Sequence, residues 1–350
     1  MHGPLTTQIR TDYYPAFDFL RGVLAITVML DHDNLFPWDR SGSFAVDVFF
    51  ALSGWLIGGI LLNLKPQDLP RFYFNRAIRI WAPYYFALIL LVAASLLRDP
   101  VTPKWLEFVF YKITFVFNIF GHPQVIDFRS MMPLAGTGSH FWSVNAEEQF
   151  YLLAPLVLVL LPLFGRTIIA WLAIAFVAWF AQMYASIAFG VLAAVVADRY
   201  GSFHQRYWPL ILLMTAGAAA FIVHDYERAA PFAAIGIVLL LAFPGIKTKI
   251  GEIIGGMSYP LYLNHWIGVF VMNYALTPMA MRDTPTRKLL SCLFSIALAI
   301  GLFTCMDRQL LRHRAALYSP TSGYALTFLA YAIVAAGLCG ALLFHTHLNR

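Results

Sequence analysis

Long apolar runs alternate with short polar segments along most of this chain. A helix needs about 20 predominantly apolar residues to cross a bilayer, so these runs predict transmembrane helices. We expect eleven spans, near residues 17–31, 44–64, 80–97, 142–164, 167–181, 184–197, 207–223, 231–244, 253–277, 289–306 and 323–344. The pattern therefore predicts an all-α, polytopic integral membrane protein, with no soluble domain and no internal repeat.

Two stretches fit this pattern less simply. The run from residue 105 to 120 is short and contains Glu107, Lys112 and Asn118, so we interpret it as interfacial or re-entrant. Residues 167–197 form either two short spans or one long tilted span. The longest polar stretch, residues 121–140, is expected to be a loop on the outer side.

The composition excludes several classes of protein. Of the 350 residues, 60% are hydrophobic and 12% are charged, whereas a soluble domain carries about 25% charged residues. A soluble enzyme, a disordered chain and a coiled coil are therefore excluded. The three cysteines lie in apolar runs without CxxC spacing, so we interpret them as core residues and expect neither a disulfide nor a metal site there: Cys292, Cys305 and Cys339.

The net charge of +6 reports orientation and indicates no nucleic-acid partner. The basic residues gather in short segments between apolar runs, and three of these segments fit a cytoplasmic location: residues 65–79, 247–249 and 308–314. This arrangement predicts a cytoplasmic N-terminal segment, residues 1–16. No cleavage site follows the first apolar run, so we expect it to stay as an anchor helix.

Charged and polar groups at membrane depth are costly, so they are the first candidates for function. Asp18, Arg21 and His32 share one face of the first predicted helix, with Arg21 towards the inner surface and His32 towards the outer one. Asp18 and Arg21 could equally form a local ion pair, and His32 could be an interfacial histidine. Asp31 and Asp33 flank His32 but point elsewhere on a helix, so we expect no metal there.

Asp47 leads a stripe of small residues on the second predicted helix. Asp47, Ala51, Gly54 and Gly58 follow one another at steps of 4, 3 and 4, which permits close helix contact. Asp47 is then either a buried contact between helices or a catalytic residue.

Arg76 and Arg79 are three residues apart, so a helical conformation puts two guanidinium groups side by side. Guanidinium groups match phosphate geometry, and this pair predicts an anion site. The alternative is that the two arginines set only the orientation and contact lipid headgroups.

Two later helices carry further candidates. Glu147 and Tyr151 share a face at the outer edge of the fourth span, where Glu147 could orient the His32 imidazole or lie at headgroup level. In the ninth span Ser258, Tyr262 and His265 form another polar face. For His265 the residues favour a core histidine that is hydrogen-bonded to a neighbouring helix over a catalytic base.

At these residues the sequence resembles the acyltransferase-3 family of multi-span membrane enzymes that modify bacterial surface glycans. The similarity runs through five blocks in family order: FDFLRG (17–22, with His32 closing the helix), VDVFFALSGWLI (46–57), RAIRI (76–80), FWSVNAEEQFYLLAP (141–155) and SYPLYLNHW (258–266). The sequence departs from the family pattern at Asn75, at Pro83 and at MDRQ (306–309).

The resemblance implies a fold and a division of the chain. It implies a core of about ten transmembrane helices over residues 17–306, and a remainder, 307–350, with a cytoplasmic basic loop, one extra transmembrane helix and a short tail. It also implies O-acyl transfer, commonly O-acetylation, from a cytoplasmic donor such as acetyl-CoA to a hydroxyl of a glycan or glycolipid.

The resemblance also implies roles for individual residues. His32 matches the essential histidine of the family, Arg76 and Arg79 its RxxR pair, Arg21 the arginine of its first motif and Glu147 the first glutamate of its WSxxxE pattern. We therefore expect Arg76, Arg79 and Arg21 to bind acyl-CoA and His32 to act as general base or acyl carrier, with Glu147 assisting. Acyl-CoA is a substrate, and we expect no permanently bound cofactor.

The alternative function is a membrane transporter of a glycan precursor or small anion, with Asp47, Glu147 and His265 on its path. The expected location is the bacterial inner membrane. The residues leave open the acceptor, which could be lipopolysaccharide, another polysaccharide or a glycolipid.

Overall fold

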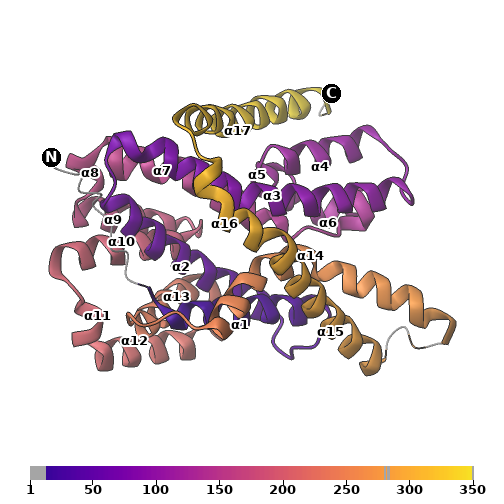
Figure 1. Cartoon of the computed structure of the whole chain (residues 1–350). Helices are drawn as coiled ribbons and strands as arrows, with labels where there is room; N and C mark the ends of the chain where they lie inside the picture. Colours follow the sequence, from indigo (N-terminus) through magenta and orange to yellow (C-terminus); the bar gives the residue numbers. More distant parts are fainter. Residues whose placement is uncertain (1–12, 280, 282–283, 349–350) are drawn as a thin grey trace. The chain divides into compact units, whose positions relative to one another are not determined.

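A computed structural model describes residues 13–279, 281 and 284–348 of the chain (Figure 1). These residues are almost entirely helical, and no strand occurs among them. Most of the predicted N-terminal segment 1–16 lies outside the described residues. The contacts divide the chain into two compact units: unit 1 is Met1–Arg21, Asp47–Lys65 and Val157–Gly255, and unit 2 is Gly22–Val46, Pro66–Leu156 and Gly256–Arg350.

Three helices contribute residues to both units: α1 (Pro15–His32), α2 (Ser41–Leu62) and α14 (Lys249–Leu276). The other helices of unit 1 are α8 (Pro162–Gly165), α9 (Ile168–Phe180), α10 (Ala185–Tyr200), α11 (Phe203–Arg206), α12 (Trp208–Phe221) and α13 (Tyr226–Leu241). Those of unit 2 are α3 (Leu69–Leu96), α4 (Pro103–Ile113), α5 (Phe117–Phe120), α6 (Val125–Phe128), α7 (Phe141–Pro155), α15 (Pro285–Leu302), α16 (Arg308–Leu317) and α17 (Pro320–Leu348).

Each predicted span contains a helix. Within the described residues, four helical segments are able to cross a membrane by their length and composition: Ser41–Leu62, Pro66–Leu96, Pro285–Leu317 and Pro320–Phe344. The two ambiguous stretches are now defined. Residues 167–197 form two separate helices, α9 and α10, that pack together. With 11 residues, α4 is only about 16 Å long, too short to cross, in agreement with the interpretation of residues 105–120.

Two segments that we expected to be basic loops are helical. Residues 69–79 form the first turns of α3, because Pro70 occupies the start of the helix, where its missing N–H costs nothing. Arg308–Leu317 form α16, which follows α15 through one π-helical turn, Phe303–Asp307. The loop predicted from residue 307 onwards is thus wrong over residues 308–317.

In unit 1, α2 and α10 approach so closely that only glycine fits at their contact. A Cβ atom on Gly54 would lie 2.2 Å from the carbonyl oxygen of Ile187, and one on Gly190 would lie 2.3 Å from that of Ala51. This is the close helix contact that the small-residue stripe of α2 predicts.

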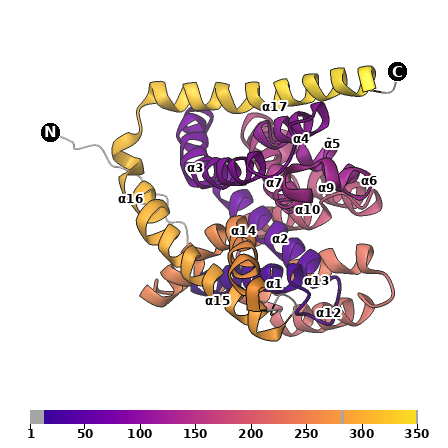
Figure 2. The ribbon, with the colours of Figure 1, turned by 90° about the vertical axis from the view of Figure 1, so that its right-hand side faces the viewer.

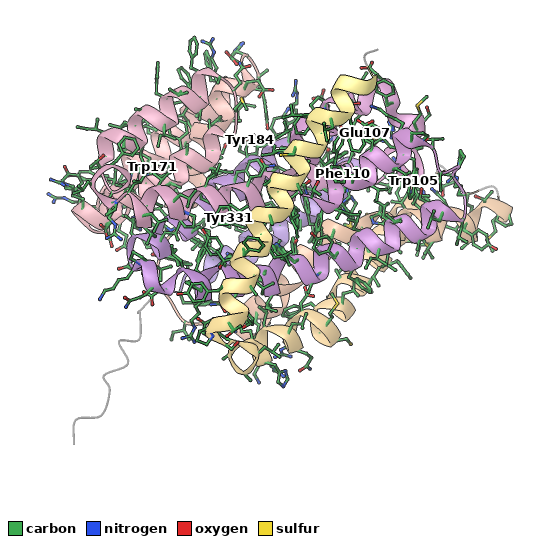
Figure 3. The ribbon with its side chains drawn as sticks, turned by 90° about the horizontal axis from the view of Figure 1, so that it is seen from above. Trp105, Glu107, Phe110, Trp171, Tyr184 and Tyr331 are labelled. Carbon is green, nitrogen blue, oxygen red and sulfur yellow. The ribbon has the colours of Figure 1, made fainter. Side chains whose placement is uncertain are left out.

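In unit 2, α17 lies against α3, α4 and α7 (Figure 2). The Tyr331 hydroxyl of α17 lies 2.7 Å from the hydroxyl of Tyr73 and donates to the carbonyl of Leu152 at 2.8 Å. Figure 3 labels Tyr331 on α17 and Phe110 on α4. The C-terminal helix is therefore fastened to the rest of its unit by polar as well as apolar contacts.

Replacing Gly54 by alanine is expected to destabilise the protein by about 1–3 kcal/mol, because the new methyl group meets a backbone carbonyl that cannot move aside. Gly59 of the same helix is the matched control, since a Cβ atom there meets nothing within 4 Å. The midpoint of thermal unfolding in detergent should fall for Gly54→Ala and stay level or rise for Gly59→Ala. Equal midpoints for the two variants would contradict the close contact.

Candidate functional site

Three histidines from distant parts of the sequence meet in unit 2. His32 ends α1, His140 precedes α7 and His265 lies within α14. Nδ1 of His32 lies 2.8 Å from Nε2 of His265. One ring nitrogen from each histidine lies within 4.8 Å of the others, with His140 and His265 buried and His32 exposed. The sequence predicts two members of this cluster and misses His140, which lies one residue outside its helix.

The backbone determines which nitrogen of each ring carries hydrogen. Nδ1 of His265 faces the carbonyl oxygens of Tyr262 at 2.9 Å and of Leu261 at 3.3 Å. A carbonyl only accepts, so Nδ1 carries the hydrogen and Nε2 of the neutral ring is an acceptor. His32 must then donate from Nδ1 to His265, which leaves Nε2 of His32 unprotonated. The arrangement gives His32 a basic nitrogen in a fixed tautomer.

Tyr262 and Ser143 hold the segment that carries His140. The Tyr262 hydroxyl donates to the carbonyl of His140 at 2.8 Å, so Ser143 donates to the Tyr262 oxygen at 2.6 Å. Ser258, also on α14, is buried. The polar face predicted from Ser258, Tyr262 and His265 thus packs into unit 2. Tyr262 contacts the start of α7, and His265 contacts the end of α1.

Lys112 is fully buried and also holds the segment that precedes α7. Its Nζ donates to the carbonyl of Gly138 at 2.7 Å and lies 3.5 Å from the centre of the Phe117 ring. Gly138 has φ +74, which favours glycine. Burial lowers the pKa of Lys112 well below its usual range. Burial, the other two histidines and Lys112 also lower the pKa of His140.

The carboxylates of Asp31 and Asp33, which we expected to point away from the His32 imidazole, hold the end of α1. Asp33 accepts from Arg287 of α15 at 2.8 and 3.0 Å, in a pair that is buried on both sides. Asp31 accepts from the Ser41 hydroxyl at 2.7 Å. Neither carboxylate is a member of the histidine cluster, and both tie the end of α1 to neighbouring helices.

Arg76 and Arg79 lie on α3, three residues apart as predicted. The Arg76 guanidinium lies over the rings of Phe72 and Tyr151, at 5.6 and 5.7 Å from their centres. Arg79 is exposed and interacts electrostatically with Asp307 and Arg314. The two arginines thus share a helix face with one guanidinium packed over rings and one exposed.

Contacts between α3 and α14 connect the arginine pair with the histidines. The Tyr259 hydroxyl donates to the carbonyl of Ile80, the residue after Arg79, at 3.2 Å. His265 follows Tyr259 by six residues, which is about 9 Å along α14.

Of the two adjacent glutamates, Glu148 is the buried one. Its carboxylate accepts a hydrogen bond from the Trp81 indole at 2.8 Å and interacts electrostatically with Arg76. Glu147 interacts electrostatically with Tyr259 and Tyr262. Sequence reasoning leads to Glu147 as the partner of His32, whereas the ring that the structure places against His32 is that of His265.

The remaining predicted residues lie in unit 1. Asp18 pairs with Arg21 at 3.5 Å and accepts from the Tyr13 hydroxyl, which is the local ion pair that the spacing allows. Asp47 accepts from Ser186 of α10 at 2.6 Å and from Tyr226 of α13 at 2.8 Å. Asp47 therefore forms a contact between three helices.

Comparison with known proteins agrees with this picture. Residues 14–306 match a family described as an acyltransferase domain. The chain is 31% identical over 172 residues to the peptidoglycan O-acetyltransferase OatA of Listeria monocytogenes, covering 44% of this chain and 25% of that protein. It is 30% identical over 154 residues to the O-acetyltransferase OatA of Staphylococcus aureus, covering 43% and 25%.

A further relative is matched along most of its length. BcsY of Komagataeibacter xylinus, named as a membrane-bound transacylase, is 26% identical over 319 residues, covering 78% of this chain and 79% of that protein. The matches to the two OatA proteins span about a quarter of their length. No solved structure matches significantly.

The family match covers more than half of the chain and includes all five sequence blocks and the three histidines. The described residues include apolar helices long enough to cross a membrane, and one relative is named as membrane-bound. Both findings support a membrane protein. The family and enzyme class predicted from the sequence are confirmed, and the chain belongs to the acyltransferase-3 family.

Proposed function

We propose that this protein is a membrane O-acyltransferase that moves an acyl group, by default acetyl, from acyl-CoA to a hydroxyl of a glycan or glycolipid. The observation that carries the proposal is the hydrogen bond between His32 and His265, which leaves Nε2 of His32 unprotonated at an exposed position. A hydroxyl acceptor needs such a base, because an alcohol is a weak nucleophile until its proton is removed.

In the proposed reaction, Nε2 of His32 takes the proton of the acceptor hydroxyl. The acceptor oxygen forms a bond to the acyl carbon, and the C–S bond of the thioester breaks. The imidazolium then returns the proton to the departing thiolate. His265 stabilises the imidazolium by accepting a hydrogen bond from Nδ1 of His32. From the sequence, we expected Glu147 to have this role. Transient transfer of the acyl group to His32 is the alternative order of steps.

Arg76 and Arg79 are the proposed anchor of the donor phosphates. A guanidinium held over two rings keeps its charge and its N–H groups in a defined direction, which suits phosphate binding. The contact between Tyr259 and Ile80 supports a donor that extends from this pair along α14 towards His265. Arg21, paired with Asp18 in unit 1, stays a proposed donor contact.

The relatives support a class of acceptor for the proposed reaction. Peptidoglycan O-acetyltransferase is the name of the Listeria relative, which supports a carbohydrate hydroxyl as acceptor in this protein as well. The positions of the basic residues support a cytoplasmic N-terminus. The location that belongs to this proposal is the bacterial inner membrane.

Replacing His32 by alanine is expected to lower the rate of acyl transfer by 10²- to 10⁴-fold, which is the usual contribution of a positioned general base. The measurement is transfer of label from radiolabelled acetyl-CoA to a membrane glycan extract by purified protein in lipid. Replacing the exposed His224 is the matched control and should leave the rate unchanged. A folded His32→Ala protein that transfers at the wild-type rate would exclude the base role.

Charge reversal of both arginines, Arg76→Glu with Arg79→Glu, is expected to weaken acetyl-CoA binding by at least tenfold, since each change replaces attraction to phosphate by repulsion. Equilibrium binding of labelled acetyl-CoA measures this directly. Arg206→Glu, an exposed residue of α11, changes the net charge in the same direction by two units and serves as the control for a non-specific effect. Donor affinity that falls equally in the control would argue against a phosphate site.

A further inference from the structure

The three histidines have the spacing of a metal-ion site as well as that of a proton-transfer pair. Their ring centres lie 4.6, 4.9 and 5.5 Å apart. Three imidazoles on one tetrahedral zinc ion hold their ring centres roughly 5 Å apart, because each Zn–N bond is about 2 Å long. The ring centres are therefore already spaced as in a metal site. The ligating nitrogens, which lie within 4.8 Å of one another, have to adjust to about 3.3 Å: the 2.8 Å contact between His32 and His265 opens slightly, and the wider separations close.

His140 provides a second and independent observation. The residue is buried, with 6% of its surface exposed, and its Nε2 has no hydrogen-bond partner among the described residues. A buried nitrogen without a partner is costly, so its position next to two other imidazoles needs an explanation. The proposed acyl transfer uses His32 and His265 and leaves His140 without a task. A ligand bound by all three rings accounts for it.

The surroundings of the rings are those of metal ligands. The second nitrogen of His265 donates to a backbone carbonyl, and His140 forms a backbone hydrogen bond with Leu263. Ligating histidines are usually oriented in this way through their other ring nitrogen. Asp31 acts electrostatically on His32, whereas the positive charge of Lys112 acts on His140. His32 is exposed, which leaves one coordination position accessible.

We propose that Nδ1 of His32, Nε2 of His140 and Nε2 of His265 together bind one divalent transition-metal ion such as Zn²⁺. To bind through Nδ1, His32 moves its ring hydrogen to Nε2. The nitrogen that the proposed function uses as a base is then protonated, and the hydrogen bond to His265 is replaced by the ion. Bound metal therefore turns acyl transfer off, and this second part of the inference rests on the proposed function.

The ion was not expected from the sequence. Asp31 and Asp33, the acidic residues next to His32 in the sequence, are hydrogen-bonded to Ser41 and Arg287 instead. The ligands proposed here come from two other segments, residue 140 and residue 265, whose approach depends on the fold.

The test measures metal binding directly, without reference to activity. Full-length protein without a polyhistidine tag is purified in detergent, stripped with chelator and titrated with Co²⁺, whose visible absorption reports tetrahedral nitrogen coordination. We expect one ion per chain, displaced by Zn²⁺. His140→Ala should weaken binding by at least 10- to 100-fold, which is the cost of losing even an outer-shell partner. His224→Ala should bind like the wild type.

Two results would overturn the metal site: no saturable binding at one ion per chain, or equal affinity in wild type and His140→Ala. If His140→Ala does not fold, His140→Gln retains a polar side chain of similar length and takes its place. The activity measurement is separate, and transfer should fall as Zn²⁺ occupancy rises and return with chelator. A protein that binds the ion but never transfers acyl groups would contradict the proposed function and leave the metal site intact.

Discussion

The hydrogen bond between His32 and His265 is the contact on which the candidate site depends, because it joins the end of α1 to the middle of α14. The rings of His32 and His265 are each held by further contacts. The carbonyls of α14 fix the His265 ring, and the buried pair of Asp33 and Arg287 fixes the residue next to His32. Removing one member of a buried ion pair costs about 3–5 kcal/mol, so the end of α1 is strongly held. The exposed imidazole of His32 is thus held by its own hydrogen bond and by the ion pair of the next residue.

Buried polar groups need hydrogen-bond partners, and this requirement explains much of the polar interior of unit 2. Asn145 of α7 accepts from the backbone N–H of Phe117 at 3.0 Å and donates to the Tyr84 hydroxyl at 3.0 Å, and Tyr84 donates to the carbonyl of Lys112 at 2.8 Å. These bonds connect α3, α4 and α7 around residues that a membrane protein buries only when they are satisfied. The segment before α7, which carries His140, is held by this network through Lys112.

Sequence alone predicts the helices and a large part of the site, because apolar runs and misplaced charges are local signals. It identifies His32, His265 and the Arg76–Arg79 pair, and it predicts the small-residue contact of α2. It does not reveal His140, since a histidine just outside a helix looks like any loop residue. The two supposed basic loops, 69–79 and 308–317, show the other limit: charge marks a membrane boundary, but a helix continues past that boundary when its backbone is satisfied. Which glutamate is buried depends on the packing of Trp81, which no sequence pattern gives.

The C-terminal helix α17 lies outside the matched family region and yet contacts the helix that carries the arginine pair. Its Tyr331 bonds to Tyr73 and to the carbonyl of Leu152, while Tyr318 just before it packs on Arg71 at 5.4 Å. Tyr73 and Leu152 are close in sequence to Arg76 and to the ring of Tyr151 that covers it. The C-terminal helix therefore covers one side of the stretch of α3 that leads to the two arginines. In a bilayer, that side of α3 faces protein instead of lipid.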